Sequence, residues 1–263
     1  MKIAILGHGV VGSGTREILE ERGFTVKKIL EKREIPEIKD RITDDFDEII
    51  SDEEIKIVVE TIGGLEPAHT FAVKTLKAKK HFVTSNKFLM SEYFGELVSL
   101  AEENGVSVRF GASAGGGIPW IHNLSRCAKT DEITEICGIM NGTTNYILDA
   151  MERKGISFSD ALKTAQSLGY AERDPSADVD GYDVARKVAL SVAAGFGKII
   201  KTEDIPTFSL KAVSLKDMAY IKEKTGRSIR YKGFAKDLIG GVSAFVEPTL
   251  VKAESLESRV SEM

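Results

Sequence analysis

The strongest constraint on the fold lies at the start of the chain, where a short apolar run leads directly into three glycines. Residues 2–6 read K-I-A-I-L, and the run G-H-G-V-V-G follows at residues 7–12. A short apolar run bounded by glycine is typical of a parallel strand that is buried on both faces. The glycines permit a tight turn, a close approach of the backbone to a pyrophosphate, and close packing of the next helix, whose N-terminal amides attract negative charge.

This pattern predicts a dinucleotide-binding turn rather than a chance glycine-rich loop, because it follows a strand and opens a helix over residues 13–22. The histidine is expected to present its backbone, not its ring, to the phosphates. The residues predicted to contact the dinucleotide in this turn are Gly7, His8, Gly9, Val10, Val11 and Gly12.

Apolar runs and helical patterns alternate along the rest of the first half. Further strands are expected at residues 24–30, 55–60, 81–84 and 106–110, and helices at residues 41–54, 67–79 and 91–104. This alternation predicts an α/β fold with a Rossmann-type doubly wound parallel sheet. Single cores stop growing near ~250 residues, so the 263 residues of the chain predict two domains. We expect a dinucleotide-binding domain over residues 1–123.

The second domain, over residues 124–263, is expected to mix helices and strands as an α+β unit. Strands are expected at residues 133–139, 231–234 and 242–248, the last two paired, and helices at residues 146–154 and 214–224. The polar tail from Ser255 is expected to be loosely held.

Charged side chains follow the second predicted strand, where the adenosine ribose of a dinucleotide would lie. An acid at this position accepts hydrogen bonds from the ribose hydroxyls and favours NAD, whereas Arg or Lys accommodates the additional phosphate of NADP. The chain has Glu31, Lys32 and Arg33 there. The sequence therefore predicts NAD or NADP without deciding between them, and a solvated charged turn is the alternative for each residue.

Polar residues also follow the strands expected at residues 55–60 and 81–84. Thr61 comes directly after the first of these strands, and Ser85 and Lys87 come after the second. Because the carboxyl ends of strands in an open parallel sheet border the ligand crevice, we expect all three residues to bind the cofactor. For Lys87 the alternative is a solvated cation at a strand end.

A second group of candidate residues lies in the second domain. Glycines and a proline interrupt the helical pattern between residues 169 and 181, so Glu172 and Asp178 are expected on a loop. Asp183 and Lys187 follow on one face of a helix whose opposite face is apolar. An ordinary surface ion pair worth ~0.3 kcal/mol is the alternative for these two residues. The acids delivered to the start of the same helix favour a catalytic cluster.

The run A-x-x-x-G-Y-A-E-x-D-P-x-x-D-V-x-G-x-D-x-x-x-K at residues 165–187 resembles the signature of the homoserine dehydrogenase family at every fixed position. The S-N-K at residues 85–87 and the N-G-T-T-N-Y at residues 141–146 are also similar to family motifs. The resemblance covers nearly the whole chain. It implies an oxidoreductase that interconverts L-homoserine and L-aspartate 4-semialdehyde with NAD or NADP, a step of threonine and methionine biosynthesis.

The resemblance also implies roles for particular residues. Lys187 exchanges a proton with the substrate oxygen, Lys87 stabilises the developing alkoxide, and Asp183 helps to fix the substrate. The acids hold the substrate ammonium, and the start of the helix after residue 141 receives its carboxylate, for which simple helix capping is the alternative. The predicted substrate-binding residues are Glu172, Asp178, Asp183, Gly142 and Thr143.

Two features depart from the family pattern. In the family, a glycine-rich loop supplies carbonyl oxygens to a monovalent cation, together with a glutamate. The corresponding carbonyls here are those of Ala114, Gly116 and Ile118, but Gly111 stands where the glutamate is usual. The case for the cation is therefore incomplete, and we predict no metal site. The chain also ends before a further strand and helix of the family's catalytic module, so a C-terminally shortened module is expected.

These departures leave two alternatives for the function. One is a catalytically impaired homologue that keeps its dinucleotide-binding domain, and the other is a dehydrogenase of a related amino-acid semialdehyde. A homodimer formed through the second domain, which would then serve both substrate binding and dimerisation, follows from the resemblance.

Composition restricts the partners and the compartment. The formal net charge of −4 offers no overall attraction to nucleic acid or to anionic lipid, and no apolar run approaches the ~20 residues that cross a bilayer. We therefore expect a small-molecule substrate, with no nucleic-acid or membrane partner. Two cysteines are too few for a disulfide framework, which fits a cytoplasmic location.

Overall fold

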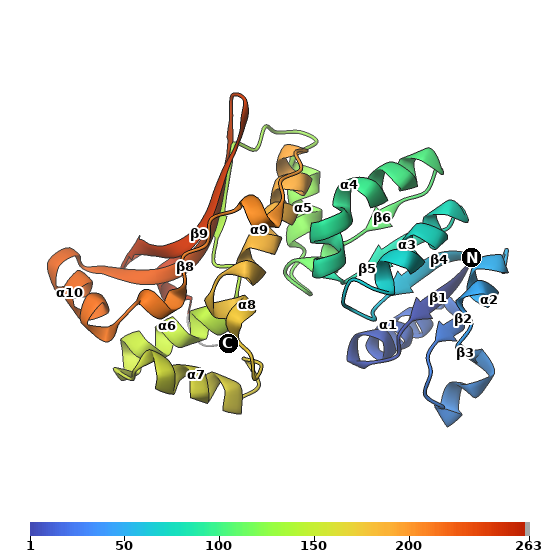
Figure 1. The fold of residues 1–263 in the computed structure, drawn as a ribbon, viewed down its shortest axis with the longest axis horizontal. Helices are drawn as coiled ribbons and strands as arrows, with labels where there is room; N and C mark the ends of the chain where they lie inside the picture. The colour runs from blue at the N-terminus through green and yellow to red at the C-terminus, as the bar shows by residue number, and fades with distance from the viewer. Residues whose placement is uncertain (261–263) are drawn as a thin grey trace. The chain divides into compact units, whose positions relative to one another are not determined.

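The structure is a computed structural model that describes residues 1–260. Its backbone divides into two compact units, Met1–Asn123 and Leu124–Met263. In Figure 1 the first unit runs from blue to green along the chain and the second from green to red. Each unit has its own sheet, and the two sheets differ in strand direction.

A six-stranded parallel sheet forms the centre of the first unit, in the order β3-β2-β1-β4-β5-β6. Its strands are β1 (Lys2–Leu6), β2 (Thr25–Leu30), β3 (Ile42–Thr43), β4 (Ile55–Glu60), β5 (His81–Thr84) and β6 (Val108–Arg109). The chain fills one side of β1 first and then crosses to the other side. This reversal confirms the predicted Rossmann-type doubly wound sheet, and it places the carboxyl ends of β1 and β4 beside each other.

Apolar residues on both faces of β1 account for its central position. Ala4 and Leu6 belong to one buried cluster with Phe46, and Ile5 belongs to a second cluster with Ile29. A strand that is apolar on both faces is stable only between two helical layers. The K-I-A-I-L run therefore becomes the middle of the sheet.

The helices of the first unit are α1 (Val10–Glu21), α2 (Phe46–Ser51), α3 (Ala68–Lys77) and α4 (Lys87–Glu103). Two of them begin earlier than predicted. Gly9 is the N-cap of α1, so this helix starts inside the glycine turn. Asn86 caps α4, because its side chain accepts a hydrogen bond from the Leu89 amide at 3.0 Å. Lys87 is therefore the first residue of a helix and not part of a loop.

The predicted helix over residues 41–54 is wrong in its first part. Ile42 lies in β3, where it pairs with Ile29 of β2. Asp45 then accepts a hydrogen bond from the Asp47 amide and starts α2. The apolar residue that suggested a helical face is used as a strand residue instead, which shortens the helix.

The second unit is an α+β arrangement around a three-stranded antiparallel sheet of order β7-β8-β9. The strands are β7 (Glu135–Gly138), β8 (Arg227–Leu238) and β9 (Gly241–Lys252). The helices are α5 (Trp120–Cys127), which begins just before the unit, α6 (Gly142–Lys154), α7 (Phe158–Ser167), α8 (Ser176–Val179), α9 (Tyr182–Phe196) and α10 (Leu215–Thr225). The expected pairing of the last two strands is confirmed, with Tyr231 opposite Pro248.

Helix α9 packs directly on this sheet, as Figure 1 shows beside β8 and β9. Val184 and Val188 are fully buried at the contact. The close approach depends on Gly233 of β8, where a Cβ atom would lie 2.5 Å from Val188 Cγ2 and 2.9 Å from Val184 Cγ1. The apolar side of α9 is therefore fixed against the sheet, as the sequence predicts.

Two segments of the second unit differ from expectation. Asp178 does not lie on an open loop, because residues 176–179 form the short helix α8. The tail after β9 is not loose up to Val260. Buried Arg230 donates to the Ser258 carbonyl at 2.7 Å, and Lys232 pairs with Glu257 at 2.6 Å.

Within residues 1–260, none of the helices is both long enough and apolar enough to cross a membrane.

Replacing Gly233 with alanine is expected to destabilise the second unit, because the added methyl group overlaps two valines on α9. Overpacking of this kind costs ~1–3 kcal/mol. Urea unfolding measures the loss. Gly138→Ala is the matched control, because Gly138 pairs with Gly233 across the sheet and has no atom within 4 Å of its own Cβ position. Equal stability of the two variants would contradict this packing.

Candidate active site

The glycine turn between β1 and α1 is built around close backbone contact. Gly7 has φ of 89°, in the region that favours glycine. A Cβ atom on Gly12 would lie 2.1 Å from the Gly7 carbonyl oxygen and 2.8 Å from Thr61 Oγ1, so only glycine fits there. Gly9, in contrast, has nothing within 4 Å of its Cβ position. The turn is therefore closed on its inner side and open at Gly9, as a bound pyrophosphate requires.

Thr61 supports this turn from the end of β4. Its hydroxyl lies 3.0 Å from each of the Leu6 and Gly7 carbonyl oxygens. The hydroxyl is thus engaged with the backbone of the turn, and Val10 and Val11 are the exposed residues at the start of α1.

Glu60, the last residue of β4, is a supporting residue that our sequence reasoning missed. Its carboxylate is fully buried and accepts hydrogen bonds from the amides of Ile62 and Gly63 at 2.7 and 2.9 Å. It also accepts one from the Thr84 hydroxyl at 2.5 Å. Glu60 therefore ties the loop after β4 to the end of β5. The available signal was an acid at the end of a mostly apolar strand, I-K-I-V-V-E.

The charged residues after β2 interact with one another. Arg33 Nη2 lies 2.8 Å from Glu31 Oε2 and 3.0 Å from the His8 carbonyl oxygen. Glu31 also accepts hydrogen bonds from the amides of His8, Lys32 and Arg33. The Arg33 side chain, with these amides, lowers the pKa of the Glu31 carboxyl to about 2. The acid predicted for NAD and the arginine predicted for NADP thus form one ion pair beside the glycine turn.

His8 contributes its backbone to this network, and its ring is turned to α1. Arg16 Nε lies 3.2 Å from His8 Nε2. Burial, followed by the nearby Arg16 charge, lowers the pKa of His8. The His8 ring thus connects the glycine turn to α1.

Ser85 and Lys87 follow β5 at the carboxyl edge of the same sheet, both of them half-buried. Between them, Asn86 is buried and donates to the Gly64 carbonyl at 2.6 Å. Asn86 thus joins the loop after β4 to the start of α4, and it fixes the neighbouring serine and lysine at the strand end.

In the second unit the structure brings Lys187 and two of the predicted acids together. Lys187 Nζ lies 2.9 Å from Asp183 Oδ2, one turn earlier on α9, and 2.5 Å from the Met140 carbonyl oxygen. Both side chains are largely buried, with 20% of Lys187 and 9% of Asp183 exposed. Asn141 Nδ2 lies 2.7 Å from Asp178 Oδ1 and 2.9 Å from Asp183 Oδ2. Asp183 and Lys187 therefore form a buried ion pair with additional hydrogen bonds, and not the exposed surface pair that was the alternative for them.

The N-G-T-T-N segment forms the first turns of α6. Asn141 is the N-cap, and Gly142 and Thr143 are the first helical residues. The Thr143 hydroxyl donates to the Tyr170 carbonyl at 2.6 Å. Its proton is thereby used, so only the oxygen of the side chain and the backbone amide can contact a ligand.

Glu172 stands apart from this cluster. Its side chain is exposed, and its carbonyl oxygen accepts a hydrogen bond from Gln166 Nε2 at 3.0 Å. Its role with the substrate stays a prediction. Asn141, in contrast, lies in the segment expected to seat a carboxylate or to cap the helix, and its side chain contacts two of the candidate acids.

In residues 1–260, no group of three or more His, Cys, Asp and Glu side chains is arranged to hold a metal ion. The expected carbonyl ligands lie at a loop where Gly115 and Gly116 have positive φ. The Ala114 side chain is buried and that of Ile118 is exposed. The absence of a cation site stays a prediction.

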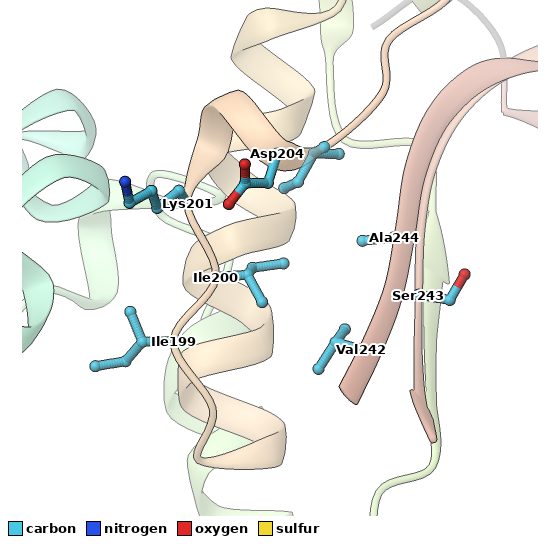
Figure 2. A pocket seen from close by; sticks show the side chains of 8 residues that line it. Ile199, Ile200, Lys201, Asp204, Val242, Ser243 and Ala244 are labelled. Carbon is cyan, nitrogen blue, oxygen red and sulfur yellow. The ribbon is translucent and has the colours of Figure 1, made fainter. Parts of the chain in front are cut away.

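A cavity of about 440 Å³ lies elsewhere in the second unit, between the segment after α9 and the start of β9 (Figure 2). Ile200 and Val242 face each other across it, whereas Lys201 and Ser243 extend away. None of its lining residues is a predicted site residue, and the lining combines aliphatic side chains with Lys201, Asp204 and Ser243. The cavity is therefore separate from the predicted site.

Family models match both units. The model described as homoserine dehydrogenase matches residues 119–263, and the model described as the NAD-binding domain of homoserine dehydrogenase matches residues 7–111. The chain belongs to the homoserine dehydrogenase family. The resemblance in the sequence motifs is thereby confirmed.

Curated relatives and solved structures agree with this assignment. The chain is 39% identical to a homoserine dehydrogenase of Synechocystis over 95% of the chain and 62% of that protein. It is 36% identical to one of Bacillus subtilis over 95% of the chain and 61% of that protein. The homoserine dehydrogenase structure of Thiobacillus denitrificans matches with a TM-score of 0.91 and 34% identity, covering 99% of this chain and 64% of that chain. The chain thus spans about three fifths of the curated relatives it matches.

The first unit fits the dinucleotide that its family domain binds. The cradle at Gly12 excludes any side chain, the position at Gly9 is open, and the amides at the start of α1 follow directly. Gly7, Gly9, Val10 and Gly12 would hold the pyrophosphate, with Glu31 or Arg33 at the ribose. The bound NAD or NADP would accept or supply a hydride.

Gly12→Ala is expected to disrupt the turn, because the methyl group would overlap the Gly7 carbonyl. We expect loss of NAD(P)H binding, measured by the fluorescence of the titrated cofactor. Gly14→Ala on the same helix is the control, since Gly14 has nothing within 4 Å of its Cβ position. Alanine there should add ~0.5–1 kcal/mol of stability and leave binding unchanged. Normal binding by Gly12→Ala would show that the turn does not hold the cofactor.

Proposed function

We propose that the chain catalyses the reversible, NAD(P)-dependent oxidation of L-homoserine to L-aspartate 4-semialdehyde. The alcohol carbon gives a hydride to NAD(P)⁺, and the hydroxyl oxygen gives a proton to a base, so the products are the semialdehyde, NAD(P)H and H⁺. The first unit holds the dinucleotide, and the second unit holds the amino acid. The observation that carries the proposal is the buried Lys187–Asp183 pair with its Met140 and Asn141 contacts.

Lys187 is the group that exchanges the proton with the substrate oxygen. An ammonium has three protons, and two of those on Lys187 are directed at Asp183 and at the Met140 carbonyl. The third can be given to the alkoxide oxygen when the semialdehyde is reduced, and it is restored from the hydroxyl in the reverse direction. Asp183 orients the lysine side chain and supports its charge. Lys87 is proposed to stabilise the negative charge that develops on the same oxygen.

The two ends of the amino acid call for opposite chemistry. The backbone amides of Gly142 and Thr143 at the start of α6 suit the α-carboxylate. The carboxylates of Glu172, Asp178 and Asp183 suit the ammonium. Glu172 is exposed, so it is available to a ligand that approaches from solvent.

We also propose a homodimer that uses the face of the second sheet opposite α9. Gly233 faces α9, and strand residues alternate between the two faces. Phe234 therefore lies on the other face, next to its paired partners Phe245 and Cys137. The two phenylalanine rings stack with centroids 4.8 Å apart and are only half-buried.

Two free cysteines are consistent with a proposed cytoplasmic location.

Lys187→Ala should lower kcat for homoserine oxidation by ~10²- to 10⁴-fold, the usual contribution of a positioned proton-transfer group. The Kd for NADPH should stay the same, because the first unit is unchanged. The absorbance of NAD(P)H at a series of homoserine concentrations measures kcat. Lys163→Ala, which removes an exposed lysine of α7, is the control and should keep full activity.

The same assay separates the alternatives. Turnover of homoserine by the wild-type chain would exclude a catalytically inactive homologue, and faster turnover of another amino alcohol would identify a related substrate. Wild-type rates in Lys187→Ala would remove that lysine from the mechanism.

Phe245→Glu is expected to dissociate the dimer, because it places a charge at the centre of the proposed contact. Sedimentation equilibrium measures the mass. Ile239→Glu is the control, since Ile239 is fully exposed at the turn of the same hairpin. A monomeric wild type, or a dimer that survives Phe245→Glu, would contradict the proposed face.

A further inference from the structure

Asn141 occupies an unusual position for a helix cap, because every polar atom of its side chain is engaged. The residue is 6% exposed. Its Oδ1 accepts a hydrogen bond from the Thr144 amide at 2.8 Å, which starts α6. Its Nδ2 donates to Asp178 Oδ1 on α8 at 2.7 Å and to Asp183 Oδ2 on α9 at 2.9 Å. One amide therefore joins three helices that are separate in sequence.

The amide can take only one orientation here. If it were flipped, its oxygen would face two carboxylates and its NH₂ group would face a backbone N–H, so each contact would become repulsive. Two carboxylates that approach each other repel, and donors shared between them offset this repulsion. Asn141 thus holds the carboxylates of Asp178 and Asp183 close together through hydrogen bonds from an uncharged amide.

The same stretch of chain also holds Lys187. The carbonyl oxygen of Met140, the residue before Asn141, lies 2.5 Å from Lys187 Nζ, and Asp183 Oδ2 lies 2.9 Å from it. Asp183 Oδ2 is therefore shared between the amide of Asn141 and the ammonium of Lys187. A shift of this carboxylate would move the lysine as well.

We propose that Asn141 is a positioning residue, which fixes Asp183 against Lys187 so that the remaining ammonium proton has a single direction. The inference rests on the proposed function, in which Lys187 transfers the proton. Misplacement of a reacting group by about 1 Å can lower a rate by ~10²-fold.

Substitution by serine and by aspartate separates this role from helix capping. Asn, Asp and Ser are nearly equal as N-caps, so both variants keep the start of α6. Asn141→Ser removes the two donors to the carboxylates. Asn141→Asp keeps the shape but places a third carboxylate against the other two. A capping role alone predicts three proteins with the same kcat.

The positioning role predicts a graded loss. We expect kcat for homoserine oxidation to fall by ~10²-fold in Asn141→Ser and further in Asn141→Asp, with little change in the Kd of NADPH. Ser157→Ala is the control for loss of a cap, because Ser157 is the N-cap of α7 and its hydroxyl bonds to Asp160. It should lose stability and keep kcat. Wild-type kcat in both Asn141 variants would overturn the proposal.

A second measurement does not depend on turnover. Lys187 can be labelled with acetic anhydride, and its rate can be compared with that of Lys163 by peptide mass spectrometry. The contacts of Lys187 Nζ with Asp183 and with the Met140 carbonyl restrict access of the reagent to the nitrogen, so labelling of Lys187 should be several-fold faster in Asn141→Ser, in which Asp183 is held less firmly. An unchanged ratio of rates would overturn the positioning role even if the wild type does not oxidise homoserine. A wild type without turnover, together with faster labelling in the variant, would reject the proposed function and keep the positioning of Lys187 by Asn141.

Discussion

The docking of α9 on β8 is the interaction on which the second unit depends. Gly233 allows the helix to approach until Val184 and Val188 touch the strand. Since these valines and the polar pair of Asp183 and Lys187 share the first two turns of one helix, fixing the apolar side also directs the polar side. The chemistry proposed for the lysine therefore relies on hydrophobic packing around it.

Close packing at a glycine also shapes the first unit, but there the glycine lies against backbone atoms and not against side chains. Gly12 lies against the Gly7 carbonyl, which also accepts a hydrogen bond from the Thr61 hydroxyl. Glu60 holds the loop after β4 by accepting a hydrogen bond from the Ile62 amide. None of these contacts needs a ligand. Contacts of this kind within the chain restrict the turn, and a restricted site loses less entropy when a dinucleotide binds.

The fold could be read from the sequence because its signals are local. The apolar run of β1, the glycine turn and the alternation of elements each lie within a few residues, and the doubly wound sheet follows from them. Helix starts were less predictable, since caps such as Gly9 and Asn86 are decided by the geometry of the preceding turn. Ile42 was misassigned because a short strand and a helical face can share one apolar residue.

In the candidate site, too, the features set by nearby residues were predictable and those set by distant residues were not. Asp183 and Lys187 were predictable from a spacing of four residues on one helix. The contribution of Asn141 was not, because its two acids lie 37 and 42 residues further along the chain. The ion pair between Glu31 and Arg33 also depends on how a turn folds back, which residue types alone do not reveal.

The segment after β9 covers a buried charge of the hairpin. The guanidinium of Arg230 is 2% exposed, and one of its partners is a carbonyl from Ser258. A fragment that stopped at the last strand would remove this acceptor and expose the ion pair between Arg230 and Glu152 to water, where such a pair contributes only ~0–1 kcal/mol. The residues just past the hairpin therefore act as a cover that keeps water away from this charge pair.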